Sequence, residues 1–114
     1  MSGITTHILD VSRGRPAAAV LVTLENRVGP GEWNVLARGV TDADGRLRDL
    51  LREGQPLAAG DFRLTFDTGG YFDGLGVEAF YPQVQVQFTI RDPRQHYHVP
   101  LLLSPYGYST YRGS

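Results

Sequence analysis

Side chains that could carry chemistry gather in one stretch of the chain, residues 96–114. This stretch holds two imidazoles, His96 and His98, a run of hydroxyl groups and the guanidinium of Arg112. Imidazole titrates near neutral pH and takes a proton from water, while guanidinium binds carboxylates and delocalised oxyanions. Chain ends are commonly frayed, yet this one is rich in strand-forming residues, so we expect it to be ordered within a larger structure.

The two histidines of this stretch lie on the polar face of a predicted strand. In a strand, alternate residues share a face, so His96 and His98 lie opposite the apolar set Tyr97, Val99, Leu101 and Leu103. His98 is the better candidate for catalysis because its strand continues into apolar sequence. The alternative is a surface histidine on a solvated sheet face.

Two further residues could act with His98. His7 shares a strand face with Thr5 and Leu9, and its alternative interpretation is a packed or hydrogen-bonded structural histidine. Arg46 follows the turn sequence of residues 42–45, whose glycine stands fourth rather than sixth, so a calcium loop is not indicated. A guanidinium presented by this turn could bind an anion, and its alternative is a solvated surface arginine.

Composition excludes several classes of function. The net charge is −1 and all 11 basic residues are arginine, so nucleic acid is not expected as a partner and lysine chemistry is absent. There is no cysteine, which excludes disulfides and thiolate catalysis, and the histidines lack the spacing of a zinc site. With no signal peptide and no apolar run of membrane-spanning length, we expect a cytoplasmic protein without a membrane partner.

The pattern of apolar residues and turns favours an all-β fold. Residues 84–91 alternate apolar and polar without a break, and turn-forming residues punctuate the chain. The length of 114 residues fits a single domain over 1–114. Only residues 68–76 are expected to be irregular or helical, and the whole predicts a β-sandwich. Strands are expected at residues 4–10, 19–24, 32–41, 62–67, 84–91, 96–103 and 107–112.

Three motifs resemble the 5-hydroxyisourate hydrolases, the transthyretin-like enzymes of urate breakdown. The first is THILD at 6–10 with GRPA at 14–17, and the second is TDADGR at 41–46. The third runs from HVPLL at 98–102 to YRGS at 111–114. The terminal YRGS is specific to the enzymes as against the hormone carriers.

The resemblance implies a sandwich of two four-stranded antiparallel sheets with one short helix at about residues 68–75. It also implies a homotetramer, a dimer of dimers, with active sites in a central channel. The catalytic residues implied are His7, Arg46 and His98, and the residues that bind substrate are Tyr111, Arg112, Gly113 and Ser114. No cofactor and no metal are implied.

The implied reaction opens the lactam ring of 5-hydroxyisourate, a small purine-derived substrate. His7 and His98 would activate the attacking water, while Arg46 would bind the anion and the developing oxyanion. Tyr111 and Ser114 would close the site by hydrogen bonds. The alternative from another class is a transthyretin-type carrier that binds a small ligand without turnover.

Overall fold

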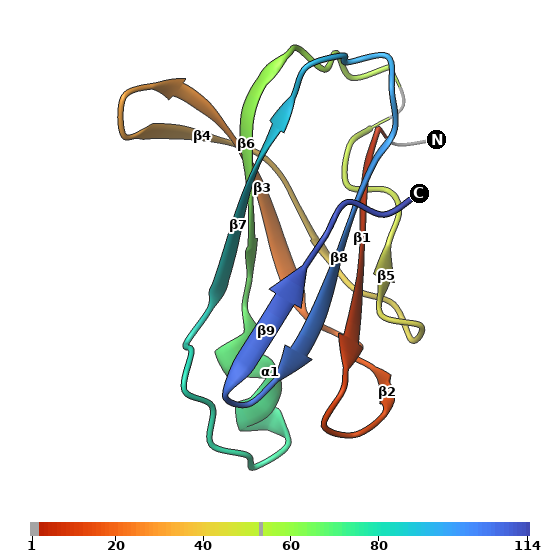
Figure 1. Cartoon of the computed structure of the whole chain (residues 1–114), viewed down its shortest axis with the longest axis vertical. Helices are drawn as coiled ribbons and strands as arrows, with labels where there is room; N and C mark the ends of the chain where they lie inside the picture. Colours follow the sequence, from red (N-terminus) through yellow and green to blue (C-terminus); the bar gives the residue numbers. More distant parts are fainter. Residues whose placement is uncertain (1–2, 53) are drawn as a thin grey trace.

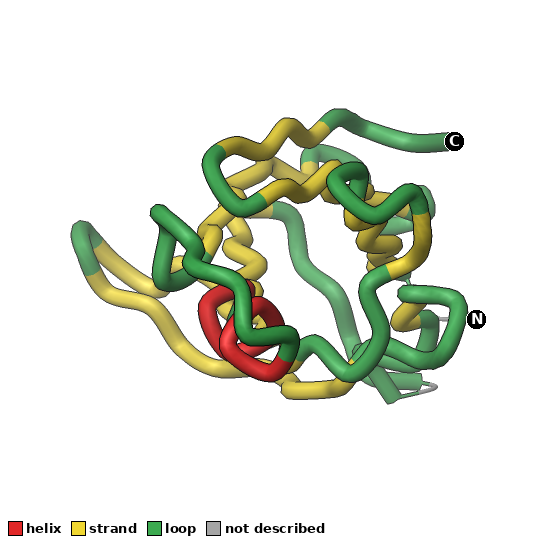
Figure 2. The backbone as a smooth tube through the Cα atoms, turned by 90° about the horizontal axis from the view of Figure 1, so that it is seen from below, coloured by secondary structure: helices red, strands yellow, loops and turns green. Residues whose placement is uncertain are grey.

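The structure is a computed structural model that describes residues 3–52 and 54–114. Within these residues there are nine strands, which form two sheets, and one short helix. Most of the strands run along the long axis of the molecule (Figure 1). Viewed along this axis, the strands form two layers with the helix at one side (Figure 2). The prediction of an all-β sandwich with one short helix is confirmed.

The first sheet contains the N-terminal strand, which carries His7, and the strand that carries His98. Its order is β2-β1-β8-β9, and β5 adds to β1 beside this path. The bounds are β1 Ile4–Asp10, β2 Arg15–Pro16, β5 Arg46–Leu47, β8 Tyr97–Ser104 and β9 Gly107–Thr110. The two-residue strands β2 and β5 were not predicted, because two residues are too few to show a period in the sequence.

One pairing in the first sheet differs from the antiparallel arrangement expected. Strands β1 and β8 run parallel, with Thr5 opposite His98 and His7 opposite Pro100. Parallel neighbours need a long crossover connection, and here that connection contains the whole second sheet, the helix and the short strands β2 and β5. The parallel pair is important for function because it brings residues from the two ends of the chain together.

The second sheet has the order β4-β3-β6-β7, and all its pairings are antiparallel. The bounds are β3 Leu21–Gly29, β4 Glu32–Val40, β6 Gly60–Phe66 and β7 Val84–Ile90. Alternation in β7 is as predicted, with Val84, Val86 and Ile90 buried between exposed glutamines. The end of the β3–β4 hairpin projects from the body of the molecule (Figure 1).

The core lies between the two sheets. Val22, Leu24 and Leu64 of the second sheet are fully buried, as are Ile8 and Leu101 of the first. Burial of each such side chain stabilises the fold by about 1.5–3 kcal/mol. One face of β1 and β8 packs against this core. The alternate residues of these strands, including His7 and His98, therefore point to the opposite face.

Helix α1, Thr68–Gly74, covers one end of the sandwich, where Phe72 is 2% exposed. The Asp67 side chain caps it by accepting a hydrogen bond from the Gly70 amide at 3.1 Å. The helix lies where it was expected. It has seven residues, and no helix in the described part of the chain is long and apolar enough to cross a membrane.

Candidate active site

The first-sheet face that points away from the core carries the candidate catalytic side chains. Thr5 on β1 and His98 on β8 are register partners, and the Thr5 hydroxyl lies 2.8 Å from Nδ1 of His98. The same hydroxyl lies 2.9 Å from Nε2 of His96, just before β8 begins. The two imidazole rings are nearly parallel, with centroids 6.4 Å apart. A single threonine thus connects both histidines of the C-terminal stretch.

Arg46 is brought to the same face by a tight turn. The Asp42 carboxylate accepts hydrogen bonds from the amides of Asp44 and Arg46, at 2.9 and 3.0 Å. Gly45 has φ +74°, and a Cβ there would clash with the Ile8 carbonyl oxygen, so the turn packs directly on β1. The Gly45 carbonyl in turn accepts from the Ile8 amide at 2.8 Å. This close approach requires glycine.

His7 lies beside Arg46 in the sheet. The two residues are register partners in the antiparallel pairing of β1 with β5, so their side chains leave the sheet on the same side. Because Thr5 and His7 are two residues apart on β1, His7 is a diagonal neighbour of His98. The side chain of His7 is half-buried. The structure therefore brings His7, Arg46 and His98 onto one face, as the sequence predicts.

A hollow of about 200 Å³ opens on this face. It is lined by Thr5, Arg46, Arg48, His96, His98 and Ser114. Two guanidiniums and two imidazoles face it, and none of its lining side chains is a carboxylate. Such a lining suits a small anion with several hydrogen-bonding atoms. His7 is not part of the lining. It lies beside the hollow, because its register partner Arg46 lines it.

The surroundings of His98 lower its pKa from the ordinary value of 6.5. Burial is the main cause, because it removes water from the charged ring, and the positive charges of His96, Arg46 and His7 add to it. A hydrogen bond to the Thr5 backbone opposes the shift. At neutral pH the ring is therefore neutral, which is the form that can accept a proton.

The C-terminal residues are divided between two places. Gly113 and Ser114 lie at His98, and the Gly113 amide donates to the His98 carbonyl at 2.8 Å. Tyr111 and Arg112 instead line a different hollow of about 320 Å³, which β7 and β8 also border. In this chain, the four residues predicted to bind substrate do not face one common pocket.

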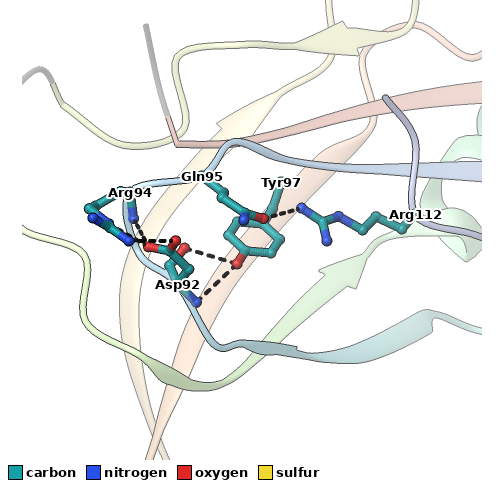
Figure 3. A network of polar contacts seen from close by, with 5 residues as sticks. All are labelled: Asp92, Arg94, Gln95, Tyr97 and Arg112. Atoms are coloured by element: carbon teal, nitrogen blue, oxygen red, sulfur yellow. Dashed lines mark hydrogen bonds and ion pairs between the residues drawn. The ribbon is translucent and has the colours of Figure 1, made fainter.

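Arg112 fastens the tail to the start of β8. Its guanidinium lies 4.5 Å from the centroid of the Tyr97 ring and donates to the Gln95 side chain at 3.0 Å. Tyr97 is itself fixed, because its hydroxyl donates to the Asp92 carbonyl at 2.9 Å (Figure 3). These contacts hold the tail where Gly113 can reach His98.

Gly113 also has a steric role. A Cβ at this position would lie 2.6 Å from Cδ2 of His98. The tail backbone therefore passes directly over the imidazole, and any larger residue would displace the ring or the tail.

Sequence reasoning did not select Thr5, His96 or Arg48 as site residues. A signal for Thr5 was present, since it shares a strand face with His7. His96 shares a face with His98 by the same rule, but the sequence could not show that one hydroxyl joins them. Arg48 follows β5 and carries no motif that would distinguish it from other arginines.

Comparison with known proteins identifies the family of this chain. The family model described as "HIUase/Transthyretin family" matches residues 4–113. The chain belongs to the HIUase/Transthyretin family. Within it, the 5-hydroxyisourate hydrolase of Caulobacter vibrioides is 50% identical to this chain, and the match covers all of both proteins.

Two solved structures of the HIUase/Transthyretin family show the same fold. Klebsiella pneumoniae 5-hydroxyisourate hydrolase has a TM-score of 0.85 and 41% identity, covering 97% of this chain and 98% of that one. Sea bream transthyretin in complex with thyroxine has a TM-score of 0.90 and 35% identity, covering 98% and 95%. The fold is thus common to hydrolase and carrier, so the site residues must decide between them.

Proposed function

We propose that this protein is a hydrolase that opens the lactam ring of 5-hydroxyisourate to give 2-oxo-4-hydroxy-4-carboxy-5-ureidoimidazoline. The observation that carries the proposal is one sheet face on which His98 and Arg46 line a cationic hollow and His7 lies beside it. A carrier of an apolar ligand has no use for imidazoles and guanidiniums at its binding site. The full-length similarity to named 5-hydroxyisourate hydrolases supports the same activity.

The proposed mechanism uses the neutral imidazole of His98 as the base. His98, whose pKa is lowered, accepts a proton from a water that His7 helps to position, and the resulting hydroxide attacks the lactam carbonyl. The ring C–N bond then breaks, and the leaving nitrogen takes that proton from His98. Arg46 binds the anionic ring and stabilises the negative charge that develops on the carbonyl oxygen. Ser114, which lines the hollow, completes substrate binding, while Arg112 holds the tail in place through Tyr97 and Gln95. No step requires a metal or cofactor.

We propose a homotetramer, a dimer of dimers, as the active form. The hollow at His98 is open on the outer face of a sheet, so a second copy would be needed to enclose a substrate there. Large aromatic side chains on and next to β9 are also left in solvent, with Tyr106 65% and Tyr111 58% exposed. Light scattering coupled to size exclusion measures the mass directly, and a monomer would contradict this proposal.

The test of the activity is ultraviolet absorbance of 5-hydroxyisourate freshly generated from urate. We expect the protein to accelerate its decay, and a variant with both His7 and His98 replaced by Asn to lose the acceleration. Decay at the spontaneous rate, with ligand still bound by calorimetry, would contradict the hydrolase and favour the carrier.

The single variant His98→Asn sharpens this test. General acid–base groups contribute about 10²- to 10⁴-fold in rate, and the half-buried ring leaves the core untouched. We expect turnover to fall by that factor while the thermal unfolding midpoint stays near that of the parent. Turnover near the parental rate would remove His98 from the mechanism.

Deletion of residues 112–114 tests the tail. The deletion removes the Arg112 contacts to Tyr97 and Gln95 and the Gly113 bond to His98, but no core side chain. We expect a folded protein without measurable turnover. Retained activity would show that the tail serves structure alone.

A further inference from the structure

The Thr5 hydroxyl contacts two imidazole nitrogens at once. Its oxygen lies 2.8 Å from Nδ1 of His98 and 2.9 Å from Nε2 of His96. Both distances are those of good hydrogen bonds. Thr5 itself is 6% exposed, so water does not compete strongly for this hydroxyl. His96, in contrast, is exposed at the end of this short chain of bonds.

A hydroxyl has one proton to donate and two lone pairs to accept with. Thr5 can therefore donate to only one of the two nitrogens. If it donates to Nε2 of His96, it must accept from Nδ1–H of His98, and Nε2 of His98 is then the basic nitrogen. No hydrogen bond within the described residues 3–52 and 54–114 occupies Nε2 of His98. The tautomer of one imidazole thus determines that of the other.

We propose that Thr5 relays a proton between His98 and His96, so that His96 holds the proton that His98 takes from the attacking water. Thr5 and His96 would then act through His98, Thr5 as a positioning residue and His96 as the temporary proton acceptor. This inference rests on the proposed hydrolase function.

The proton movements balance over one turnover. When Nε2 of His98 takes the proton of water, the Nδ1 proton of His98 moves to Thr5, and the Thr5 hydroxyl proton moves to Nε2 of His96. His98 is again neutral, and His96 carries the charge. When the leaving nitrogen of the lactam takes the Nε2 proton of His98, the two transfers reverse. All three side chains return to their starting state.

The surroundings of His98 give the relay a physical purpose. Its charged and titratable neighbours are His7 on β1, Arg46 in β5 and the adjacent Arg48, besides His96. Burial and the positive charges of His96, Arg46 and His7 lower the pKa of His98, so an imidazolium is unfavourable there. At the exposed His96, water can solvate the charge.

The test compares three single variants and one double variant. Thr5→Val removes the hydroxyl and keeps the shape of the side chain, Thr5→Ser keeps the hydroxyl, and His96→Gln keeps a hydrogen-bonding group that takes no proton. Thr23→Val, on the outer face of the other sheet, is the matched control. The readouts are kcat for 5-hydroxyisourate and the ¹⁵N chemical shifts of the His98 ring, which report its tautomer without substrate.

We expect Thr5→Val and His96→Gln each to lower kcat by about tenfold to a hundredfold. Thr5→Ser should restore most of the rate, and the double variant should be no slower than Thr5→Val, because both changes break one path. The His98 ¹⁵N shifts should differ between His96→Gln and the parent. They should be the same in the double variant as in Thr5→Val alone. The relay would be overturned if the losses of kcat in the two single variants multiplied in the double variant. It would also be overturned by a parental kcat in Thr5→Val or His96→Gln, or by an inactive Thr5→Ser.

The ring shifts separate this proposal from the proposed function. If the parent protein fails to hydrolyse 5-hydroxyisourate, the hydrolase proposal fails, while the ¹⁵N shifts still decide whether Thr5 couples the two rings. If Thr5→Val does not fold, the exposed His96→Gln alone decides the matter. His98 shifts that stay unchanged in His96→Gln would overturn the coupling.

Discussion

Two arginines, one on the outer face of each sheet, have opposite surroundings. Arg63 on β6 donates to both carboxylate oxygens of Glu25 at 2.9 and 3.0 Å, and its guanidinium lies 4.3 Å from the centroid of the Trp33 ring. Arg46 on β5 has no ion-pair partner among residues 3–52 and 54–114, and its neighbours are mainly histidines and Arg48, with the Asp42 carboxylate near enough for an electrostatic interaction.

The difference between the two arginines separates structure from function. A guanidinium with a bidentate carboxylate and an aromatic ring is fully satisfied and stabilises the sheet that holds it. A guanidinium without an ion pair, held mainly among other cations, contributes little to stability and is suited to an anion that comes from outside. Sites of this kind commonly reduce stability for the sake of activity.

Matched substitutions would test this comparison, and the expected effects are large. Arg46→Gln should lower kcat/KM for 5-hydroxyisourate by about 10²- to 10³-fold, because it removes a donor to the developing oxyanion, and should leave the unfolding midpoint unchanged or raised. Arg63→Gln should leave turnover unchanged and lower the free energy of unfolding by about 1–3 kcal/mol, because Glu25 loses a charged partner. Steady-state kinetics and urea denaturation of both variants measure the two effects.

The comparison fails if the effects are exchanged or shared. A destabilised Arg46→Gln with a proportional loss of turnover would mean that Arg46 holds the sheet rather than the substrate. Loss of turnover in Arg63→Gln would mean that the second sheet takes part in the reaction.

The tail allows a second comparison with a smaller expected effect. Gly113→Ala would place a methyl group 2.6 Å from the His98 ring, whereas a methyl group at Gly107 in β9 would have only the Ser104 hydroxyl within 4 Å, at 3.7 Å. Because small displacements of a catalytic group are costly, we expect Gly113→Ala to lower kcat by about tenfold to a hundredfold. Gly107→Ala should turn over at nearly the parental rate.

Equal kinetics for the two glycine variants would show that the tail can move away from His98 without cost. The ¹⁵N shifts of the His98 ring give a second measurement, since only Gly113→Ala should alter them.

The fold was predictable because its determinants are local. Alternation along β7 and β8 and the turns between strands are visible in any short window of the sequence, and these windows gave the sandwich. The parallel pairing of β1 with β8 was missed, because no local pattern shows which distant strand will be a neighbour. The two-residue strands β2 and β5 were missed for lack of any period.

The sequence predicted several residues of the candidate site but not the hydrogen bonds and contacts between them. Alternation placed His7 and His98 on the outer face, and the tight turn of residues 42–45 indicated Arg46 as a possible anion-binding residue. The bond from Thr5 to both histidines depends on the register of β1 with β8, and the division of the tail depends on the stacking of Arg112 on Tyr97. Such contacts between distant residues follow from tertiary packing rather than from spacing in the sequence.

The smallest expected effect is a shift in pH dependence that again distinguishes the two arginines. Burial and nearby positive charges, including Arg46, lower the pKa of His98 below 6.5, so the ring stays neutral as the pH falls through 6.5. We therefore expect the acid limb of kcat/KM to lie below pH 6.5. In the same window, stability should decrease with falling pH, because the unfolded chain binds a proton at this histidine that the folded protein does not. NMR titration of the His98 ring should show a higher pKa in Arg46→Gln than in the parent, and an unchanged pKa in Arg63→Gln. A His98 pKa above 6.5 in the parent, or an equal shift in both variants, would mean that the cationic hollow does not control this ring.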